Sequence, residues 1–328
     1  MTVQAEEFEG AKRTLAGRLK ETPSIYFSIA VLVFFVLLFY WHEPAFLESY
    51  NLGIIGLSAA ILLTVGIGQC WTIVTGGIDL SVGGLISLVS VIFVLTVGTL
   101  GLWAYPFCLL IGACCGYING LLLTRIKIPS FIATLGTGGI FVSVAYLITP
   151  KAVSVPGGSI KLLNVVNGST FGQKNAILLS LLFFLVFFVI QYFTPIGRNI
   201  FYVGSNIKMS WLSGVNIVST KNVAFTFSGI GAAAAGLILA SRQFSGYPTI
   251  GAPYILSSIA TVVLGGTAMT GGAGGMLNTL IGAVLMSVLQ NGMTVTGVDV
   301  YLQQSLLGTM IILCVWVSFD RNKVEIVK

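Results

Sequence analysis

Asp79 is the charged residue best placed to act on a solute. It is the sole Asp, Glu, Lys or Arg between Glu48 and Arg125, and it stands in a glycine-rich stretch, Gly76-Gly77-Ile78-Asp79-Leu80-Ser81-Val82-Gly83-Gly84. An acidic side chain beside membrane-like apolar segments usually faces protein or a water-filled cavity. Asp79 also precedes an apolar run, so its carboxylate could cap a helix by accepting from free N–H groups at the positive helix end. We therefore expect a cap that holds a broken helix, a polar group on a solute route, or both.

Other polar side chains also lie in apolar surroundings. Together with Asp79 they are the candidates for contact with a solute: Ser81, Asn119, Thr134, Gln290, Asn291 and Gln303. Amide groups carry both donors and acceptors, which suits solutes rich in hydroxyl groups. The same amides suit hydrogen bonds between helices, so both interpretations stay open for each of them.

Residue patterns typical of enzymes are missing. The one histidine, His42, excludes an H-E-x-x-H zinc site, and the sequence has neither a G-x-x-x-x-G-K-[ST] phosphate loop nor a G-x-S-x-G nucleophile turn. The five cysteines lack C-x-x-C or Cys/His ligand spacing, which is typical of small packing residues. We expect no metal, no cofactor and no catalytic residue, and hence a conduit or carrier instead of an enzyme.

The composition requires lipid as the solvent of this chain. Of its 328 residues, 56% are hydrophobic and only 8% are charged, whereas about 25% charge is usual for a soluble domain. This excludes a secreted protein or a nucleic-acid binder. Long unbroken apolar runs favour helices over a membrane barrel, whose strands would alternate. We predict an all-α polytopic membrane protein in which residues 1–328 form a single transmembrane domain.

Stretches free of charged residues give the number of crossings. One helical crossing needs about 20 apolar residues, and six charge-free stretches have room for one crossing each. Two longer stretches, 80–124 and 243–298, have room for two each. The sequence thus predicts about 10 transmembrane helices, at 24–41, 51–74, 81–99, 102–123, 130–149, 175–193, 222–241, 255–270, 275–296 and 300–319.

Basic residues predict the orientation, because Lys and Arg concentrate on the cytoplasmic side of a membrane. With the N-terminus inside, 12 of the 16 basic residues fall on inner segments, and the outer loops hold the other four, which are Lys151, Lys161, Lys174 and Arg242. We expect both termini in the cytoplasm. The inner segments are then residues 1–23, a long loop at 194–221 and a tail at 320–328.

Glycine clusters predict interrupted helices at two places. Four of the ten residues from Thr75 to Gly84 are glycine, which disfavours a regular helix, and a similar cluster runs from Gly265 to Gly275. The helix-breaking positions are expected at Gly76, Gly77, Gly83, Gly265 and Gly266. Each cluster separates two apolar spans, so we predict two related halves with broken helices, a pattern typical of transporters.

A further set of glycines predicts close packing of helices. Gly112, Gly116 and Gly120 recur every four residues along the span 102–123, which allows a neighbouring helix to approach closely.

The loop 194–221 mixes apolar and basic residues. It could form one or two short helices on the inner surface, which would either dock in the groove of a partner or lie on the membrane interface.

Several motifs resemble those of the ribose-type sugar permeases of ABC importers. They are Gly76-Gly77-Ile78-Asp79-Leu80-Ser81-Val82-Gly83, Ile128-Pro129-Ser130-Phe131-Ile132-Ala133-Thr134-Leu135-Gly136, Val203-Gly204-Ser205-Asn206 with Leu212-Ser213-Gly214-Val215-Asn216, Val263-Leu264-Gly265-Gly266-Thr267 and Leu280-Ile281-Gly282-Ala283. They follow the family order from about residue 50 to 319. Met269-Thr270 and Gly274-Gly275-Met276-Leu277 differ from the residues that are usual in this family.

The resemblance implies a multi-pass protein of the bacterial inner membrane that works with other chains. These are a cytoplasmic ABC ATPase, commonly with two nucleotide-binding halves in one chain, a second permease chain that is identical or paralogous, and a periplasmic solute-binding protein. The resemblance assigns coupling to the ATPase to the loop that holds Arg198, Gly204, Asn206, Ser213, Gly214 and Asn216. The expected function is uptake of a monosaccharide by alternating access, driven by ATP hydrolysis on the separate ATPase.

Two other functions stay open at this point. An ion-coupled secondary sugar transporter would use Asp79 to carry a proton or Na⁺, and a channel-like partner in a larger complex would allow flux without ATP. The sequence decides neither which sugar is carried nor whether the two permease chains are identical.

Overall fold

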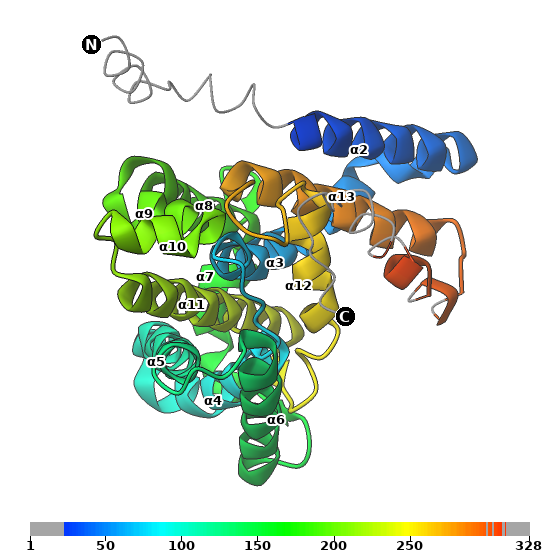
Figure 1. Ribbon diagram of the computed structural model, residues 1–328. Coiled ribbons are helices and arrows are strands. Elements are labelled where there is room, and N and C mark those ends of the chain that lie inside the picture. The colour runs from blue at the N-terminus through cyan, green and yellow to red at the C-terminus, as the bar shows by residue number, and fades with distance from the viewer. Residues whose placement is uncertain (1–22, 300, 304, 310–311, 313–328) are drawn as a thin grey trace.

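The computed structural model describes residues 23–299, 301–303, 305–309 and 312, and these residues are almost entirely helical (Figure 1). The main helices are α2 (Pro23–His42), α3 (Ser49–Val74), α4 (Val82–Leu100), α5 (Ala104–Thr124), α6 (Ser130–Ile148), α8 (Asn175–Phe193), α11 (Ile217–Gln243), α12 (Tyr254–Leu264) and α13 (Met276–Val295). Shorter helices are α7 (Asn164–Asn167), α9 (Pro195–Ser205) and α10 (Ile207–Leu212), with 3-10 turns at Pro44–Leu47 (η2), Gly101–Trp103 (η3) and Gly157–Leu163 (η4).

The helical fold confirms a polytopic membrane protein but does not confirm ten crossings. In the described part of the chain, seven apolar segments are long enough to cross a membrane: Ile25–His42, Ser49–Val74, Val82–Thr124, Ser130–Ile148, Asn175–Phe193, Ile217–Gln243 and Met276–Val295. The third of these contains both α4 and α5, separated only by η3. The predicted crossing at 300–319 falls largely outside the described residues, as do the N-terminal segment and the tail at 320–328.

The predicted crossing at 255–270 is wrong in its length. The helix α12 ends at Leu264 and has only 11 residues, which span about 16 Å, roughly half of the hydrocarbon core. Gly265 and Gly266 follow directly, and Gly266 has a φ of +95°, a conformation that ends the helix. The glycine cluster thus shortens this span to a half-crossing.

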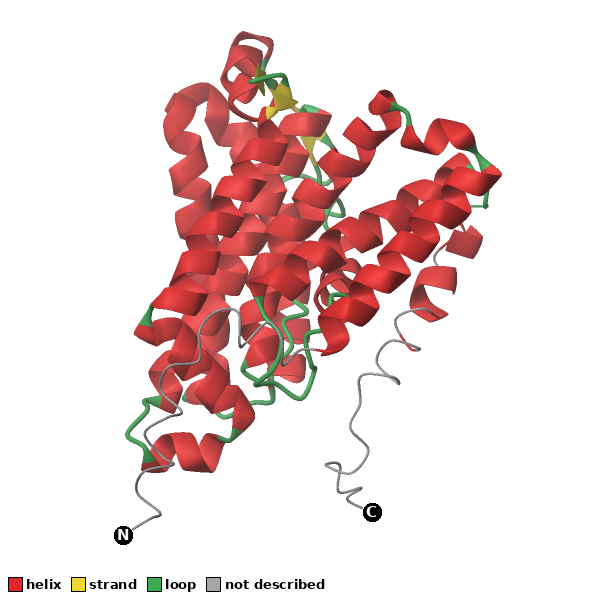
Figure 2. Ribbon diagram, turned by 90° about the horizontal axis from the view of Figure 1, so that it is seen from above, coloured by secondary structure: helices red, strands yellow, loops and turns green. Residues whose placement is uncertain are grey.

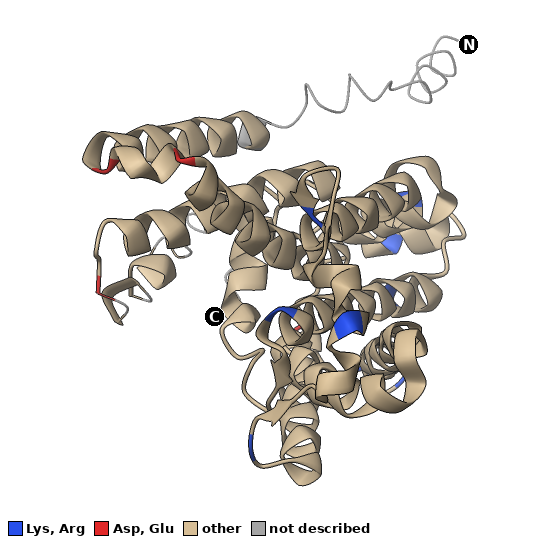
Figure 3. Ribbon diagram, turned by 180° about the vertical axis from the view of Figure 1, so that it is seen from behind, with Lys and Arg blue, Asp and Glu red and all other residues tan. Residues whose placement is uncertain are grey.

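Helices α3 and α11 form the centre of the protein. Two hydrophobic clusters make up its core, and both helices contribute side chains to each of them. Helix α11 packs against α3, α4 and α5, while α3 also packs against α8, α12 and α13. In Figure 1, α2 lies at one edge beside α13, and α6 lies at the opposite edge. Figure 3 shows how few charged residues the helical body carries.

The close packing predicted for the glycines of α5 is confirmed. A side chain at Gly116 would strike the carbonyl oxygen of Phe225 on α11, and one at Gly112 would strike the side chain of Ala233. A side chain at Gly120 would come within 2.8 Å of the Cα atom of Asn222 on α11. The three glycines therefore allow close contact between α5 and α11 over residues 112–120.

Short strands join the loops at one end of the helix bundle (Figure 2). Strand β1 (Val153–Ser154) pairs antiparallel with β4 (Ser245–Gly246), and β2 (Ser169–Thr170) pairs antiparallel with β3 (Gln173–Lys174). The Asn167 amide also donates to the Ser241 carbonyl over 2.7 Å. The β1–β4 pair and the Asn167 bond tie the segment after α6 to the end of α11 and the loop that follows it, and so hold one end of the bundle together.

Substitution of Gly116 by Ala tests the α5–α11 contact. The added methyl group would force the two helices apart, and overpacking of this kind costs about 1–3 kcal/mol. We expect Gly116→Ala to lower the melting temperature of the detergent-solubilised protein. The matched control is Gly53→Ala, since Gly53 is also helical but has open space around it. Equal melting temperatures for the two variants would contradict the contact.

Candidate coupling site and the two helix breaks

The first helix break lies between α3 and α4 and is closed around Asp79. Gly76 has a φ of +76°, which turns the chain back toward the body of the protein after α3 ends at Val74. The Asp79 side chain is only 1% exposed. Its Oδ1 atom accepts from the backbone N–H of Ser81 over 2.9 Å and from the Ser81 hydroxyl over 2.6 Å. The carboxylate therefore fixes the turn that leads into α4.

Asparagine and glutamine amides hold this turn from two neighbouring helices. Asn119 on α5 is fully buried and donates through Nδ2 to the Ser81 hydroxyl over 2.8 Å. Gln69 on α3 is also fully buried. With its nitrogen turned toward the Asp79 carbonyl, the Gln69 amide donates to that carbonyl over 3.1 Å. Its oxygen then accepts from the backbone N–H of Asp79 over 3.3 Å. The extended backbone of the break is thereby paired, as a low-dielectric environment requires.

Helix α6 supplies the remaining hydrogen bonds of the first break. The Ser130 hydroxyl accepts from the N–H of Ile78 over 3.2 Å, and the Thr134 hydroxyl accepts from the N–H of Leu80 over 3.0 Å. Both α6 side chains thus replace hydrogen bonds that a continuous helix would have made within itself.

Four of the seven predicted solute contacts meet at this break, which are Asp79, Ser81, Asn119 and Thr134. Each of the four side chains is at most 1% exposed. Asp79 also supports the start of α4, although the carboxylate bonds Ser81, the residue that precedes the helix, instead of an N–H group in the first helical turn. In this conformation Asp79, Ser81 and Asn119 are joined by hydrogen bonds, while Thr134 bonds the backbone beside them. Contact of the four residues with a solute remains a prediction.

The other three predicted solute contacts lie elsewhere. Asn291 on α13 exchanges two side-chain hydrogen bonds of 2.9 Å with Asn51 on α3, which is the helix-bonding alternative left open by the sequence. Gln303 donates to the Val298 carbonyl over 2.8 Å. Gln290 is partly exposed on α13. None of these bonds links the three residues to Asp79.

Gly83, predicted as a breaking glycine, lies inside α4. A side chain there would strike Ile255 on α12, so Gly83 serves close packing between α4 and α12. The chain breaks before it, at Gly76 and Gly77, because the hydrogen bonds of Asp79 fix the start of α4 at Val82.

The second break runs from Gly265 to Gly275, between α12 and α13. Asn278 donates to the Gly265 carbonyl over 2.9 Å, and the N–H of Gly275 donates to the Thr267 hydroxyl over 3.2 Å. Gln191 on α8 is fully buried and accepts from the N–H of Met276, the first residue of α13, over 2.8 Å. Like the first break, the second is closed by side-chain amides and hydroxyls.

The two breaks meet each other and the end of α9. The N–H of Gly272 donates to the carbonyl oxygen of Val74, the last residue of α3, over 2.9 Å. Gly204 of α9 packs so closely on Val74 that a side chain at this position would strike the same carbonyl oxygen. Ser205 lies directly against Gly272. The end of α3, the end of α9 and the second break therefore meet at one place. We refer to the contact among Val74, Gly204, Ser205 and Gly272 as the junction.

The loop 194–221 forms two short helices, α9 and α10, as its composition predicted. Three of the predicted coupling residues shape it: Asn206 caps α10 by accepting from the N–H of Met209 over 3.0 Å, and Asn216 caps α11 by accepting from the N–H of Ser219 over 2.9 Å. Gly214 takes a φ of +80° in the turn between them. Both caps are local interactions that fix the direction of each helix.

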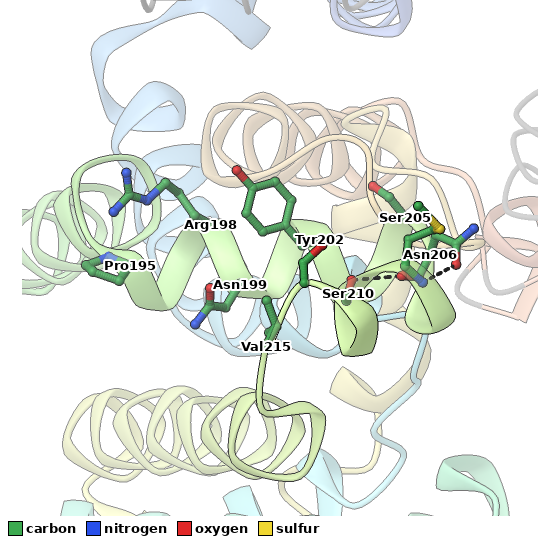
Figure 4. Close-up of a pocket in the computed structure, with 10 residues that line it drawn as sticks. Pro195, Arg198, Asn199, Tyr202, Ser205, Asn206, Ser210 and Val215 are labelled. Atoms are coloured by element: carbon green, nitrogen blue, oxygen red, sulfur yellow. Dashed lines mark hydrogen bonds between the residues drawn. The ribbon is translucent and has the colours of Figure 1, made fainter. Parts of the chain in front are cut away.

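A hollow of about 580 Å³ opens between α9, α10 and the turn that follows (Figure 4). Arg198 and Tyr202 project from the same side of α9 at its rim. Ser213 is exposed and also lines the hollow. Next to it, α10 exposes large apolar side chains, namely Met209, Trp211 and Leu212. Positive charge and exposed apolar side chains therefore lie side by side here, a combination suited to a protein partner.

Gln69, Gln191 and Ser130 are functional candidates that the sequence reasoning missed. Gln69 and Gln191 each stand in a helix that is otherwise strongly apolar. An amide far from the start of an apolar span was the signal that could have identified both glutamines, because such a group must find a partner inside the protein. Within the described residues, no three His, Cys, Asp or Glu side chains gather to hold a metal ion.

Two substitutions at Asp79 test the network of the first break. Asp79→Ala removes the acceptor and leaves the Ser81 N–H and hydroxyl buried without it, which costs about 1–3 kcal/mol. Asp79→Asn keeps an oxygen in the same place. We expect the melting temperature in detergent to fall clearly for Asp79→Ala and much less for Asp79→Asn. A larger loss for Asp79→Asn than for Asp79→Ala would contradict the assigned role.

Comparison with known proteins identifies the relatives of this chain. A family model described as "Branched-chain amino acid transport system / permease component" matches residues 51–315. The ribose import permease protein RbsC of Bacillus subtilis is 34% identical over 287 residues, which cover 86% of this chain and 88% of that protein. The fructose import permease protein FrcC of Rhizobium meliloti is 31% identical, covering 94% of this chain and 89% of that protein.

The D-allose transport system permease protein AlsC of Escherichia coli is 30% identical, with 84% of this chain and 85% of that protein covered. No solved structure matches. The family match and these relatives together cover both helix breaks and the loop 194–221. The chain therefore belongs to the permease-component family of transport systems that includes the ribose-type sugar import permeases.

Proposed function

We propose that this chain is the transmembrane permease subunit of an ABC importer that takes up a monosaccharide. A separate solute-binding protein delivers the sugar, and a separate cytoplasmic ATPase drives its passage. The family and the sugar permeases among its relatives support a transport component. A permease of this kind needs no ATP site of its own, which agrees with the missing phosphate loop.

The junction is the observation that carries this proposal. The segment assigned to the ATPase interface reaches both helix breaks directly, because Gly204 packs on Val74 and Ser205 packs on Gly272. A displacement of α9 therefore acts on the end of α3 and on the loop before α13 without any intervening element. Arg198, Asn206 and Ser213 line the hollow beside these helices and are exposed, so they are open to a partner.

Transport then proceeds by alternating access. ATP binding closes the ATPase halves and moves α9 and α10. Through the junction this motion shifts the two broken helices against α11, and the two permease chains open a central path to the other side of the membrane. Each break moves as a unit, because side-chain hydrogen bonds hold its backbone.

The proposed class of solute, a monosaccharide, is inferred from the names of the relatives. Their names assign ribose, D-allose, fructose and L-arabinose, so pentoses and hexoses are the sugars to test. The proposed setting is the bacterial inner membrane with both termini in the cytoplasm. The proposed complex contains two permease chains, and the ATPase joins two nucleotide-binding halves in one chain.

Reconstitution tests the function and the junction together. Proteoliposomes with the permease, its ATPase and its solute-binding protein should accumulate at least one of these four sugars only when ATP is present. We expect Gly204→Ala to lower ATP-driven uptake by about tenfold, because its methyl group would displace α9 from Val74 and weaken the coupling. Gly53→Ala, in open space on α3, is the control.

Two results would overturn the proposal. One is uptake by the permease alone that follows a proton or Na⁺ gradient and is lost in Asp79→Asn, which would indicate an ion-coupled transporter. The other is flux of sugar in the absence of ATP, which would indicate a channel. Equal uptake in Gly204→Ala and in the control would contradict the role of the junction but not the role as a permease.

Thiol labelling tests the proposed orientation. In a variant whose five native cysteines are replaced by Ala, Lys161→Cys should react with a membrane-impermeant maleimide added to intact spheroplasts. Lys208→Cys should react only after the membrane is opened, since α10 is assigned to the cytoplasmic side. The reverse labelling pattern would place the loop 194–221 outside and exclude it as the ATPase interface.

A further inference from the structure

Gln191 lies near the end of α8, where the chain leads into α9. Its side chain points toward the start of α13. It is the third residue from the end of α8 and fully buried. Its Oε1 atom accepts from the N–H of Met276 over 2.8 Å, and its Nε2 atom lies 4.0 Å from the sulfur of Cys70 on α3. One amide therefore contacts the start of α13 and the C-terminal part of α3.

The start of α13 depends on this external acceptor. The first N–H groups of a helix have no partner within the helix, and a residue with a polar side chain usually caps them. Here the capping position is Gly275, which has no side chain and a φ of +138°. A side chain at Gly275 would meet Gln191 Oε1 and the Tyr192 hydroxyl, each at 2.8 Å. Gln191 thus occupies the place that a capping side chain would take.

Backbone contacts tie Gln191 equally closely to α9. Gly197, in the first turn of α9, packs on the Gln191 carbonyl so tightly that a side chain at position 197 would strike it. The far end of α9 is held by Gly204 and Ser205 at the junction. Helix α9 is therefore fastened to the segment 272–276 at both ends, through Gln191 at its beginning and through Ser205 at its end.

We propose that Gln191 is a positioning residue for transport: it fixes the start of α13 to the coupling helix α9, so that α9 and the segment 272–276 move as one body. This inference rests on the proposed function for its meaning in transport. The hydrogen bond from Met276 prevents the second break from yielding when α9 is displaced. Without this hydrogen bond, a displacement of α9 is transmitted only in part to α13. Less sugar is then imported for each ATP hydrolysed.

Three variants separate positioning from mere stability. Gln191→Leu keeps a similar volume and removes the acceptor. Gln191→Glu keeps an oxygen that can accept from the N–H of Met276, at the helix end that favours negative charge. Ser180→Ala is the matched control on α8, because the buried Ser180 hydroxyl bonds only within its own helix, to the Ile177 carbonyl over 2.8 Å.

The first measurement is amide hydrogen exchange of the solubilised permease, which needs no partner protein. Gln191→Leu should raise the exchange of residues 276–279 by about fivefold, the factor expected from one lost hydrogen bond. Gln191→Glu and Ser180→Ala should leave this exchange within about twofold of the original chain. Unchanged exchange in Gln191→Leu would overturn the proposal, whatever the transport assays give.

The second measurement is the number of sugar molecules imported per ATP hydrolysed in the reconstituted complex, with ribose, D-allose, fructose and L-arabinose as probes. Gln191→Leu should lower this ratio by about fivefold, and Gln191→Glu should restore it. A merely structural role would lower uptake and ATP hydrolysis in proportion and leave the ratio unchanged, which would overturn the proposal. If the complex with the original permease imports none of the four sugars, the proposed function fails instead, and the exchange data still decide whether Gln191 positions α13.

Discussion

Every backbone N–H and C=O group inside the membrane must find a partner within the protein, and the rest of this structure depends on that constraint. Helices meet it by themselves, but the stretches 75–81 and 265–275 are not helical, and turn hydrogen bonds satisfy only part of their backbone. Polar side chains of neighbouring helices supply further bonds: Gln69, Ser130 and Thr134 at the first break, and Gln191 and Asn278 at the second. Several of the polar groups in an otherwise apolar chain thus lie where the backbone is irregular.

The same constraint explains how the interior is connected to the surface loop. In the proposed mechanism, a break that is hydrogen-bonded to several helices transmits a displacement, whereas a loose loop would absorb it. The contact of Gly204 and Ser205 with Val74 and Gly272 places the surface helix α9 against two such rigid breaks. The glycines there are needed because backbone meets backbone, as it also does where α5 packs on α11.

Much of this could be predicted from the sequence, and the exceptions have a physical reason. Apolar spans, glycine clusters and the short helices of the loop 194–221 follow from composition and from local conformational preference. Gly116 is recognisable by its four-residue spacing. The half-length of α12 and the helical position of Gly83 are not, because composition does not show which glycine of a cluster interrupts a helix. Gly265 and Gly266 end α12, and the hydrogen bonds of Ser81 to Asp79 fix the start of α4 before Gly83. The pairings of Asn51 with Asn291 and of Gln191 with Met276 join residues 240 and 85 positions apart, and no local pattern indicates which amide finds which partner.

Spin-label distances in the assembled transporter test the central claim most directly, that α9 and the second break move together. In a variant without native cysteines, one label pair joins Ile196 on α9 to Thr270 in the second break, and another joins Thr270 to Arg125 at the end of α5. All three positions are exposed. Between the nucleotide-free and ATP-bound states, we expect the distance from Ile196 to Thr270 to stay constant while the distance from Thr270 to Arg125 changes. A change in the first distance with a constant second distance would contradict the account.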